Sequence, residues 1–520
     1  MIKEGVYRNL CSDQEDSQRV PVCYGQEIRL NLMFTVAAVA ANVSAFPVGT
    51  ILDTYGPRIC GIIGSCLLAV GALSLAFAAQ MPVFDAYIAG YLFLALGGPF
   101  VYISSFHLSN AVPTHSGLVL AALNGAFDAS SAVFLIFRVI NEKTGGSFSI
   151  QRFSLAYLVT PLFIITAQMF VMPSVSYKTA GELIQQAHAH IAAEASDRVR
   201  GNIQDRDEGV RQRNARRTHR QEVIDKIHGF LVESGDREAA SSIKALFDRG
   251  NRPDTRTPTP KPNKPTSGST WGTLHGLPAG QQIRSPWFIL ITLFAILQML
   301  RLNYFIASIR QQYEYLFASP RLARHLNEDF DFILPIGGLI AVPFVGAIMD
   351  YWASTFILTV LVTTATLIGI LGCIPHSLIA GYTNIALFVI YRPFYYTAIS
   401  DYAAKVFGFQ TFGKVYGLMI CLAGLGNFAQ AGLDTLTFRV FCHNPIPVNV
   451  VLMAVTGLVG VVLVGFVWWK TRYMANLGTV SGIEDGGMPF HENEDDDSVG
   501  NGEEEPLLNT SRRGYGTAGG

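Results

Sequence analysis

The sequence predicts an all-α protein that crosses a membrane many times as two helical bundles. Half of its 520 residues are hydrophobic, only 15 % are charged, and the mean hydropathy is +0.31. These values are too apolar for an ordinary soluble chain. Eleven apolar stretches are each long enough to cross a bilayer core of roughly 30 Å, which needs about 20 helical residues. A long polar stretch separates the first five from the last six.

The predicted spans define five segments along the chain. The N-terminal spans are 30–52, 59–79, 86–106, 117–140 and 153–172. The C-terminal spans are 286–308, 330–349, 354–374, 378–398, 412–433 and 448–469. We therefore expect an outer or lumenal segment (1–29), an N-terminal transmembrane half (30–172), a cytosolic loop (173–285), a C-terminal transmembrane half (286–472) and a disordered cytosolic tail (473–520).

The distribution of basic residues predicts the orientation of the chain. Segment 173–285 holds 18 of the 38 Lys and Arg residues, and basic loops favour the cytosolic side. Lys470 and Arg472 follow the last span on the same side, because six spans lie between them and the loop. The N-terminal segment then lies outside. Two six-helix halves would need one more span before Met1, so we expect that the first helix is missing from this sequence.

Several function classes are excluded by what the sequence lacks. A net charge of −1 provides no field for capturing nucleic acid. The seven cysteines are scattered and include no CxxC pair, which argues against a disulfide scaffold and a structural zinc. The signatures GxxxxGK[ST], GxSxG and HExxH are absent, and the spans carry no catalytic cluster of His, Cys or carboxylates. We expect no enzyme activity, no metal and no cofactor.

Two short motifs recur at similar spacing in the two groups of spans. The first span ends in PVGTILD with Asp53, and the seventh ends in PFVGAIMD with Asp350, 297 residues later. The third span carries GPF at 98–100, and the ninth carries RPF at 392–394. Parallel repeats around a central site are one plan of transporter folds. The spacing therefore predicts a duplicated unit.

The segment GTILDTYGPR resembles the loop motif of the major facilitator superfamily, GxxxDxxGxR. Its matching residues are Gly49, Asp53, Gly56 and Arg58. The carboxylate of Asp53 would take Arg58 as a partner and face the N-terminus of a neighbouring helix, where the helix dipole favours an anion. The resemblance implies a gate at the inner end of the bundle, with Asp350 as the counterpart in the second half. The alternative is that these are ordinary charges at the membrane ends.

Polar clusters inside the spans resemble solute carrier family 43, including its fungal members. They include Asn124 to Asp128 in the fourth span, Arg301-Leu-Asn303-Tyr304 in the sixth, and Tyr391-Arg392-Pro-Phe-Tyr395 in the ninth. The resemblance covers both membrane halves but neither the central loop nor the tail. It implies facilitated transport of a small, roughly neutral solute. Relatives in that family carry large neutral amino acids without sodium coupling, and one carries purine nucleobases.

Six residues in the spans are candidate substrate contacts. Asp128 lies eleven residues into its span, about 16 Å deep. An ionisable group costs at least roughly 2.5 kcal/mol at the bilayer centre, so it faces a cavity or a partner. Asp128 would accept from a substrate ammonium, and Arg392 or Arg301 would bind a carboxylate. Three further polar or aromatic residues complete the candidate set: Asn303, Tyr304 and Tyr395. The alternative is that Asp128 pairs with an arginine across the two halves, as a structural link or a gate.

The sequence leads to one functional hypothesis with two alternatives. We expect a transporter that moves a leucine-like neutral amino acid by alternating access, with a small-molecule solute and the lipid bilayer as its partners. The first alternative is a purine nucleobase as the substrate. The second is a nutrient receptor or scaffold that signals through the central loop without transport.

Segments outside the membrane carry two further predictions. Cys11 and Cys23 both fall in the outer segment and would form a disulfide, although Cys442 lies on the same face and competes. The tail resembles an acidic dileucine sorting signal, formed by Glu503, Leu507 and Leu508. This signal predicts a sorting adaptor as a partner and a vacuolar or lysosomal membrane as the location, with the plasma membrane as the alternative.

Overall fold

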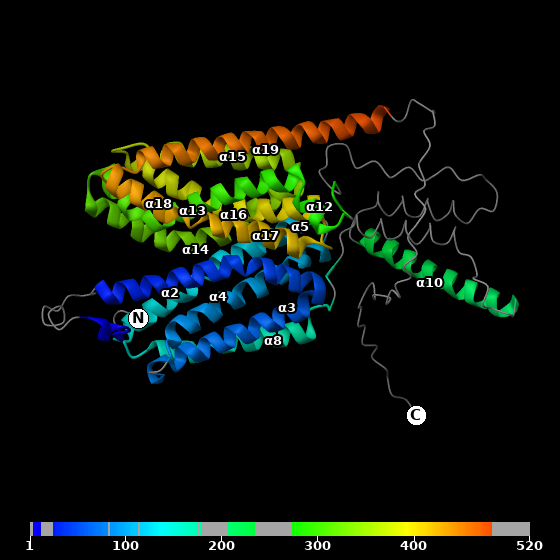
Figure 1. Cartoon of the computed structure of the whole chain (residues 1–520), viewed down its shortest axis with the longest axis horizontal. Helices are drawn as coiled ribbons and strands as arrows, with labels where there is room; N and C mark the ends of the chain where they lie inside the picture. The colour runs from blue at the N-terminus through cyan, green and yellow to red at the C-terminus, as the bar shows by residue number, and fades with distance from the viewer. Residues whose placement is uncertain are drawn as a thin grey trace. The chain divides into compact units, whose positions relative to one another are not determined.

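The computed structural model describes residues 4–11, 24–81, 84–112, 115–174, 176–177, 206–233, 273–275 and 277–480. Within these ranges all regular structure is helical (Figure 1). The chain divides into two compact units. The first contains both groups of apolar helices and comprises Met1–Glu182 and Ser269–Trp469, and the second comprises Leu183–Gly268 and Lys470–Gly520.

The described residues of the N-terminal half of the membrane unit form seven α-helices, besides short 3-10 turns. They are α2 (Tyr24–Val43), α3 (Ala45–Ala76), α4 (Ala86–Ser105), α5 (Ser116–Ala129), α6 (Ala132–Lys143), α7 (Ile150–Tyr157) and α8 (Val159–Phe170). Helix α3 is broken at Gly56, whose φ of 82° and ψ of 172° suit glycine. Pro57 then begins the next leg. The first predicted span is therefore α2 with the first leg of α3, and the second span is the second leg.

The C-terminal half and the residues just before it contain eight α-helices, besides a short π-helix at Leu436–Val440. They are α12 (Ala279–Ile283), α13 (Pro286–Phe317), α14 (Pro320–Tyr351), α15 (Ser354–Leu371), α16 (Leu378–Phe407), α17 (Phe412–Gly426), α18 (Ala429–Thr435) and α19 (Ile446–Val480). Local sequence explains where three of them begin. The side chains of Ser285, Ser319 and Ser377 accept a backbone N–H in the first turn of α13, α14 and α16. Proline occupies the first position of α13 and α14, where no N–H is needed.

Nine helical segments of the described chain are long and apolar enough to cross a membrane. One of them, Leu32–Ala76, has 45 residues and holds two legs because Gly56 interrupts it. Helix α16 is not among the nine because it is more polar, but its 30 residues are long enough to cross. All eleven predicted spans are thus helices, and the predicted all-α membrane fold is confirmed.

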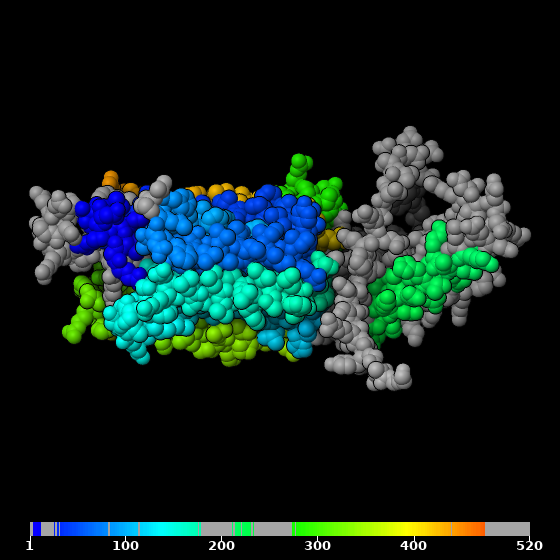
Figure 2. Space-filling model, turned by 90° about the horizontal axis from the view of Figure 1, so that it is seen from below, coloured from blue at the N-terminus to red at the C-terminus, as the bar shows by residue number. Residues whose placement is uncertain are grey.

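The outer surface of the N-terminal half is apolar. Helix α8 exposes Val159, Leu162 and Phe163, the last of them to 71 %. Figure 2 shows this helix, in cyan, on the surface beside the blue α3 and α4. Large exposed apolar patches are rare on soluble monomers but suit contact with lipid tails.

The two halves of the membrane unit meet mainly through two helix pairs, with smaller contacts of α5 with α16 and of α2 with α17. Helix α3 packs against α17, and α5 packs against α14. Each pair takes one helix from each half, and Figure 1 shows the blue and cyan helices of the first half beside the green to orange helices of the second. Side chains from both halves can therefore meet at the interface between the two bundles.

The second unit contains one described helix of the polar central segment, α10 (Arg206–Glu233). Among its described side chains, those of Val223, Ile224 and Ile227 are buried. The predicted sorting signal at residues 503–508 lies outside the described residues.

Candidate functional site

Asp53 binds the N-terminus of a helix from the other half. One carboxylate oxygen accepts the backbone N–H of Gly413 and the other accepts that of Lys414, both at 2.8 Å. These N–H groups belong to the first turn of α17 and have no partner within their own helix. A carboxylate at this position also interacts favourably with the positive end of the helix dipole. Asp53 therefore caps α17 across the interface between the halves.

Asp350 makes the same contact with the halves exchanged. It lies at the end of α14, and its carboxylate accepts the backbone N–H groups of Gly117 at 2.7 Å and Leu118 at 3.3 Å. These two groups begin α5 of the N-terminal half. The two motif aspartates thus occupy equivalent positions 297 residues apart, which supports the predicted duplication.

Both contacts require glycine, because the backbones of the two halves approach very closely. A Cβ atom at Gly49 would overlap the carbonyl oxygen of Gly413, and one at Gly117 would overlap the side chain of Met349. These contacts lie at the loop end of the bundle, which we define as the end where α8 ends and α13 begins. At the same end, but within the C-terminal half, Thr411 just before α17 donates to Gln282 of α12 at 2.7 Å. The two halves are therefore closed against each other at the loop end.

The predicted pairing of Asp53 with Arg58 is wrong. Arg58 instead donates from Nε to the backbone carbonyl of Met172 at 2.8 Å, and no ion pair joins it to Asp53 among the described contacts. The turn at Gly56 places Arg58 on the second leg of α3, which packs against α8. The carbonyl groups after the end of α8 attract a cation. Arg58 thus links two helices of its own half rather than the gate.

Asp128 and Arg392 form an ion pair between the two halves. Asp128 lies on α5 and Arg392 on α16, and Oδ1 of the aspartate is 3.4 Å from Nη1 of the arginine. The Asp128 side chain is 2 % exposed and that of Arg392 is 18 % exposed. Tyr396 lies beside the pair. This geometry corresponds to the alternative of a cross-half pair that the sequence left open.

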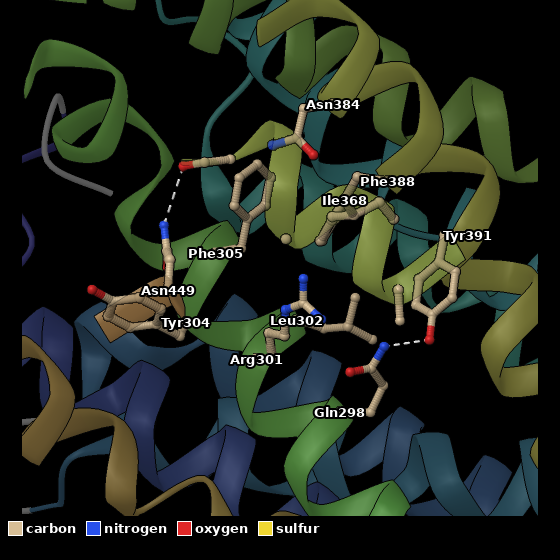
Figure 3. A pocket seen from close by; sticks show the side chains of 13 residues that line it. Gln298, Arg301, Leu302, Tyr304, Phe305, Ile368, Asn384, Phe388, Tyr391 and Asn449 are labelled. Atoms are coloured by element: carbon tan, nitrogen blue, oxygen red, sulfur yellow. Dashed lines mark hydrogen bonds between the residues drawn. The ribbon is translucent and has the colours of Figure 1, made fainter. Parts of the chain in front are cut away.

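Arg301 lies in a separate cavity inside the C-terminal half. The cavity has a volume of about 30 Å³ and lies between α13, α15, α16 and α19 (Figure 3). Gln298 and Tyr391 line it and are hydrogen-bonded to each other. Asn449, another lining residue, donates to Gln312 at 2.9 Å. Tyr304 also lines the cavity, and its hydroxyl shares a hydrogen bond of 2.8 Å with Thr437.

The remaining two candidates, Tyr395 and Asn303, belong to neither group. Tyr395 is 2 % exposed, and its hydroxyl donates to the backbone carbonyl of Ala295 at 3.1 Å, within the C-terminal half. Asn303 is half-buried and does not line the cavity. The structure thus brings together Asp128 with Arg392 and, at a second place, Arg301 with Tyr304.

Sequence reasoning missed three polar residues that line the Arg301 cavity: Gln298, Asn384 and Asn449. Gln298 lies three residues before Arg301, and this spacing places both side chains on the same face of α13. The spacing could therefore have identified Gln298 as a neighbour of Arg301. Asn384 lies seven residues before Tyr391 on α16, which is also a same-face spacing. Asn449 lies on α19, and nothing in the local sequence connects it with the other residues.

The N-terminal segment is fastened to the outer ends of helices α7 and α4. Glu4 accepts the backbone N–H of Ile150, the first residue of α7, with both carboxylate oxygens at 3.0 and 3.1 Å. The Tyr7 hydroxyl donates to Asp85 at 2.6 Å, and Arg29 pairs with Asp85 at 3.0 Å. Burial, and next the hydrogen bond to the Asp85 carboxylate, raise the pKa of Tyr7 above its ordinary value.

The predicted disulfide is only partly within the described chain. Cys11 is disulfide-bonded, whereas Cys442, the competing candidate, carries a free thiol. Cys23 lies outside the described residues.

Comparison with known proteins gives a match over most of the chain. The Major Facilitator Superfamily matches residues 21–431. Protein FMP42 of Saccharomyces cerevisiae is 42 % identical over 463 residues, which cover 88 % of this chain and 87 % of that protein. Equilibrative nucleobase transporter 1 of Bos taurus is 22 % identical over 84 % of this chain and 82 % of its own length.

Two further similarities are more limited. The human Large neutral amino acids transporter small subunit 3 is 25 % identical over 31 % of this chain and 30 % of its own length. Among solved structures, the proton:xylose symporter XylE superposes with a TM-score of 0.52 at 11 % identity, over 85 % of this chain and 86 % of that one, which supports the fold alone. The family match, the similarity to FMP42 and the helical fold lead to the same conclusion: the chain belongs to the Major Facilitator Superfamily of membrane transporters.

Proposed function

We propose that this transporter carries a leucine-like neutral amino acid by facilitated diffusion with alternating access. The observation that carries this proposal is the Asp128–Arg392 ion pair between the halves. A neutral amino acid is a zwitterion whose ammonium and carboxylate match these two side chains in charge. A solute of this class can therefore bind here if its own charged groups replace each partner of the pair.

Exchange of partners explains how binding would separate the helices that carry the pair. The substrate ammonium would bind Asp128, and its carboxylate would bind Arg392 through forked hydrogen bonds. Each buried charge keeps an opposite charge throughout, so the large penalty of an unpaired buried ion is avoided. The direct link between α5 and α16 is meanwhile replaced by a link through the substrate.

The contacts at the loop end would then form one of the two gates. Asp53 and Asp350 hold the halves together there through four backbone hydrogen bonds. Release of the substrate at this end requires these bonds to break as the halves rock. Both contacts use the same chemistry, so we expect them to open together.

Competition for uptake tests the proposed substrate. Cells or vesicles that contain the full chain are given labelled leucine together with unlabelled leucine, leucinol or adenine. We expect leucine to compete strongly and leucinol weakly, because leucinol lacks the carboxylate that Arg392 would bind. Competition by adenine alone would contradict the proposal.

A purine nucleobase is the second candidate substrate. It is favoured by the similarity to the nucleobase transporter, which extends over 84 % of the chain, whereas the similarity to the human amino acid transporter extends over 31 %. A nucleobase carries no charge pair and would not need to replace the Asp128–Arg392 contact. Uptake of labelled adenine that persists in an Asp128→Asn variant would favour this candidate. Nutrient-dependent binding of a partner to the segment 173–285 without any flux would favour the receptor alternative.

We also propose that the tail directs the protein to a vacuolar or lysosomal membrane. The support is the sequence pattern of Glu503, Leu507 and Leu508. Replacement of both leucines by alanine should move a tagged protein to the plasma membrane. An unchanged location in microscopy would contradict this assignment.

A further inference from the structure

We propose that Arg301 binds a monovalent anion inside the C-terminal half, either chloride or the carboxylate group of a solute. The cavity is distinct from the cross-half pair, because neither Asp128 nor Arg392 lines it. Arg301 projects from α13 into this cavity (Figure 3). Its Nη1 atom is fully buried and has no hydrogen-bond partner. The anion would occupy the space in front of this nitrogen.

The charge of Arg301 lacks a counterion among the described side chains. A guanidinium stays protonated in proteins. The titratable groups that interact electrostatically with it are Tyr391 and Cys373, and both side chains are uncharged at neutral pH. A buried cation without an opposite charge is strongly unfavourable, more so within a membrane span. A bound anion supplies the missing charge.

Two amide side chains lie at the cavity, and that of Gln298 can complete the donor set. Gln298 and Asn384 line the cavity and donate to the hydroxyls of Tyr391 and Tyr313, the second at 2.9 Å. Their buried carbonyl oxygens have no partner. A tyrosine hydroxyl donates as well as accepts, so half a turn of the Gln298 amide keeps its bond to Tyr391 and satisfies the oxygen. The Tyr313 hydroxyl already donates to the Gly381 carbonyl at 3.5 Å, so Asn384 keeps its orientation. The NH₂ group freed by the turn of Gln298 would be available to the anion.

The dimensions of the cavity restrict the ligand. Its volume of about 30 Å³ admits one ion of the size of chloride, or one carboxylate group, but no whole amino acid. The rings of Phe305 and Phe388, with centroids 4.5 Å apart, form part of the wall. Gly369 leaves room for the guanidinium, because a Cβ atom there would lie 2.5 Å from Nη2 of Arg301.

Thermal unfolding of the purified full chain tests this site. The melting temperature is measured in sodium chloride and in sodium isethionate, whose anion is too large for the cavity, at equal ionic strength. We expect chloride to raise the melting temperature saturably, by about 2 °C or more, because a ligand that binds only the folded state stabilises it. Arg301→Gln should remove this shift. The matched control is Arg310→Gln, on the same helix, whose exposed side chain pairs with Glu314; it should keep the shift.

A second arm separates the two sources of the anion. Leucine and leucine amide, which lacks the carboxylate, are added in the isethionate buffer. Stabilisation by leucine but not by leucine amide, lost in Arg301→Gln, would assign the site to a substrate carboxylate. Gly369→Ala keeps every charge but displaces the guanidinium, and it should weaken either response if Arg301→Gln does not fold.

The outcomes separate this proposal from the proposed transport function. A chloride shift that depends on Arg301, in a protein that does not transport leucine, would support the anion site and contradict the proposed substrate. A wild-type protein that responds neither to chloride nor to the leucine carboxylate would overturn the anion site, whatever its transport activity.

Discussion

At the scale of single residues, the most specific prediction concerns the buried ion pair of Asp128 and Arg392. Breaking a buried pair leaves one charge without a partner, which costs about 3 kcal/mol or more in similar cases. Asp128→Asn should therefore lower the melting temperature and reduce leucine uptake by about tenfold or more. Uptake and unfolding measured on the same preparations check both effects.

The exchanged double variant Asp128→Arg with Arg392→Asp provides the control for that prediction. It restores an ion pair in which α5 carries the base and α16 the acid, so it should recover most of the lost stability. Its uptake should remain low if transport depends on the native arrangement around each charge. Full stability of the Asp128→Asn variant would show that the pair contributes little in the native protein.

Gly49 is a second residue with a specific expectation. A methyl group there would overlap the Gly413 carbonyl, so Gly49→Ala should prevent closure at the loop end. A cysteine introduced on the interface near that end should become more reactive toward a soluble thiol reagent. Gly98→Ala is the matched control, because a Cβ at Gly98 meets nothing within 4 Å. Equal reactivity in the two variants would contradict the close contact.

At the scale of helices, the two reciprocal caps predict matched effects. Asp53→Asn and Asp350→Asn each remove the charge and one acceptor oxygen from a helix N-terminus, which costs about 1 kcal/mol at such positions. Each variant should therefore shift the protein toward opening at the loop end to a similar extent. Reactivity of the same introduced cysteine measures this shift. A large effect of one variant and none of the other would contradict equivalent roles.

The N-terminal segment gives a pH-dependent prediction at its contact with the start of α4. The raised pKa of Tyr7 means that folding favours its protonated form. Its stabilising contribution is full below the ordinary tyrosine value of about 10 and is lost as pH rises above it. The difference in melting temperature between wild type and Tyr7→Phe should shrink between pH 9 and pH 11. A difference that stays constant over this range would contradict the burial of the Tyr7 hydroxyl beside Asp85.

Local patterns predicted the helices well but not the full candidate site. The spans follow from apolar runs of the length that a bilayer requires, and the contact of Asp53 with a helix N-terminus follows from a simple electrostatic rule. The partner of Arg58 was wrong because the turn at Gly56 directs the following leg toward α8. The Arg301 cavity combines four helices that are distant in sequence, so only tertiary packing places Asn384 and Asn449 beside it.

At the scale of the whole molecule, the covalent connection between the halves contributes little to the interface described. The contacts of α3 with α17 and of α5 with α14 lie within the membrane unit, outside the polar segment 183–268. We therefore expect residues 1–182 and 269–520, expressed together as separate chains, to assemble and to transport. Co-purification of the two pieces and uptake by them measure this. Failure to co-purify would mean that the interface needs the linking segment.

The reciprocity of the two aspartate caps has a consequence for how such an interface arises. Each half gives one carboxylate and receives one, as the subunits of a two-fold symmetric homodimer do when the same patch of each touches its copy. The cross-half pair departs from this symmetry, because Asp128 and Arg392 have no equivalent pair with the halves exchanged among the described ion pairs. The symmetric contacts thus lie at the loop end. The charge pair is not symmetric, because its acid belongs to the N-terminal half and its base to the C-terminal half. Two identical subunits related by a two-fold axis would carry the same residue at equivalent positions, so they could not place an acid in one subunit only. Fusion of the two halves into one gene would have allowed these positions to diverge.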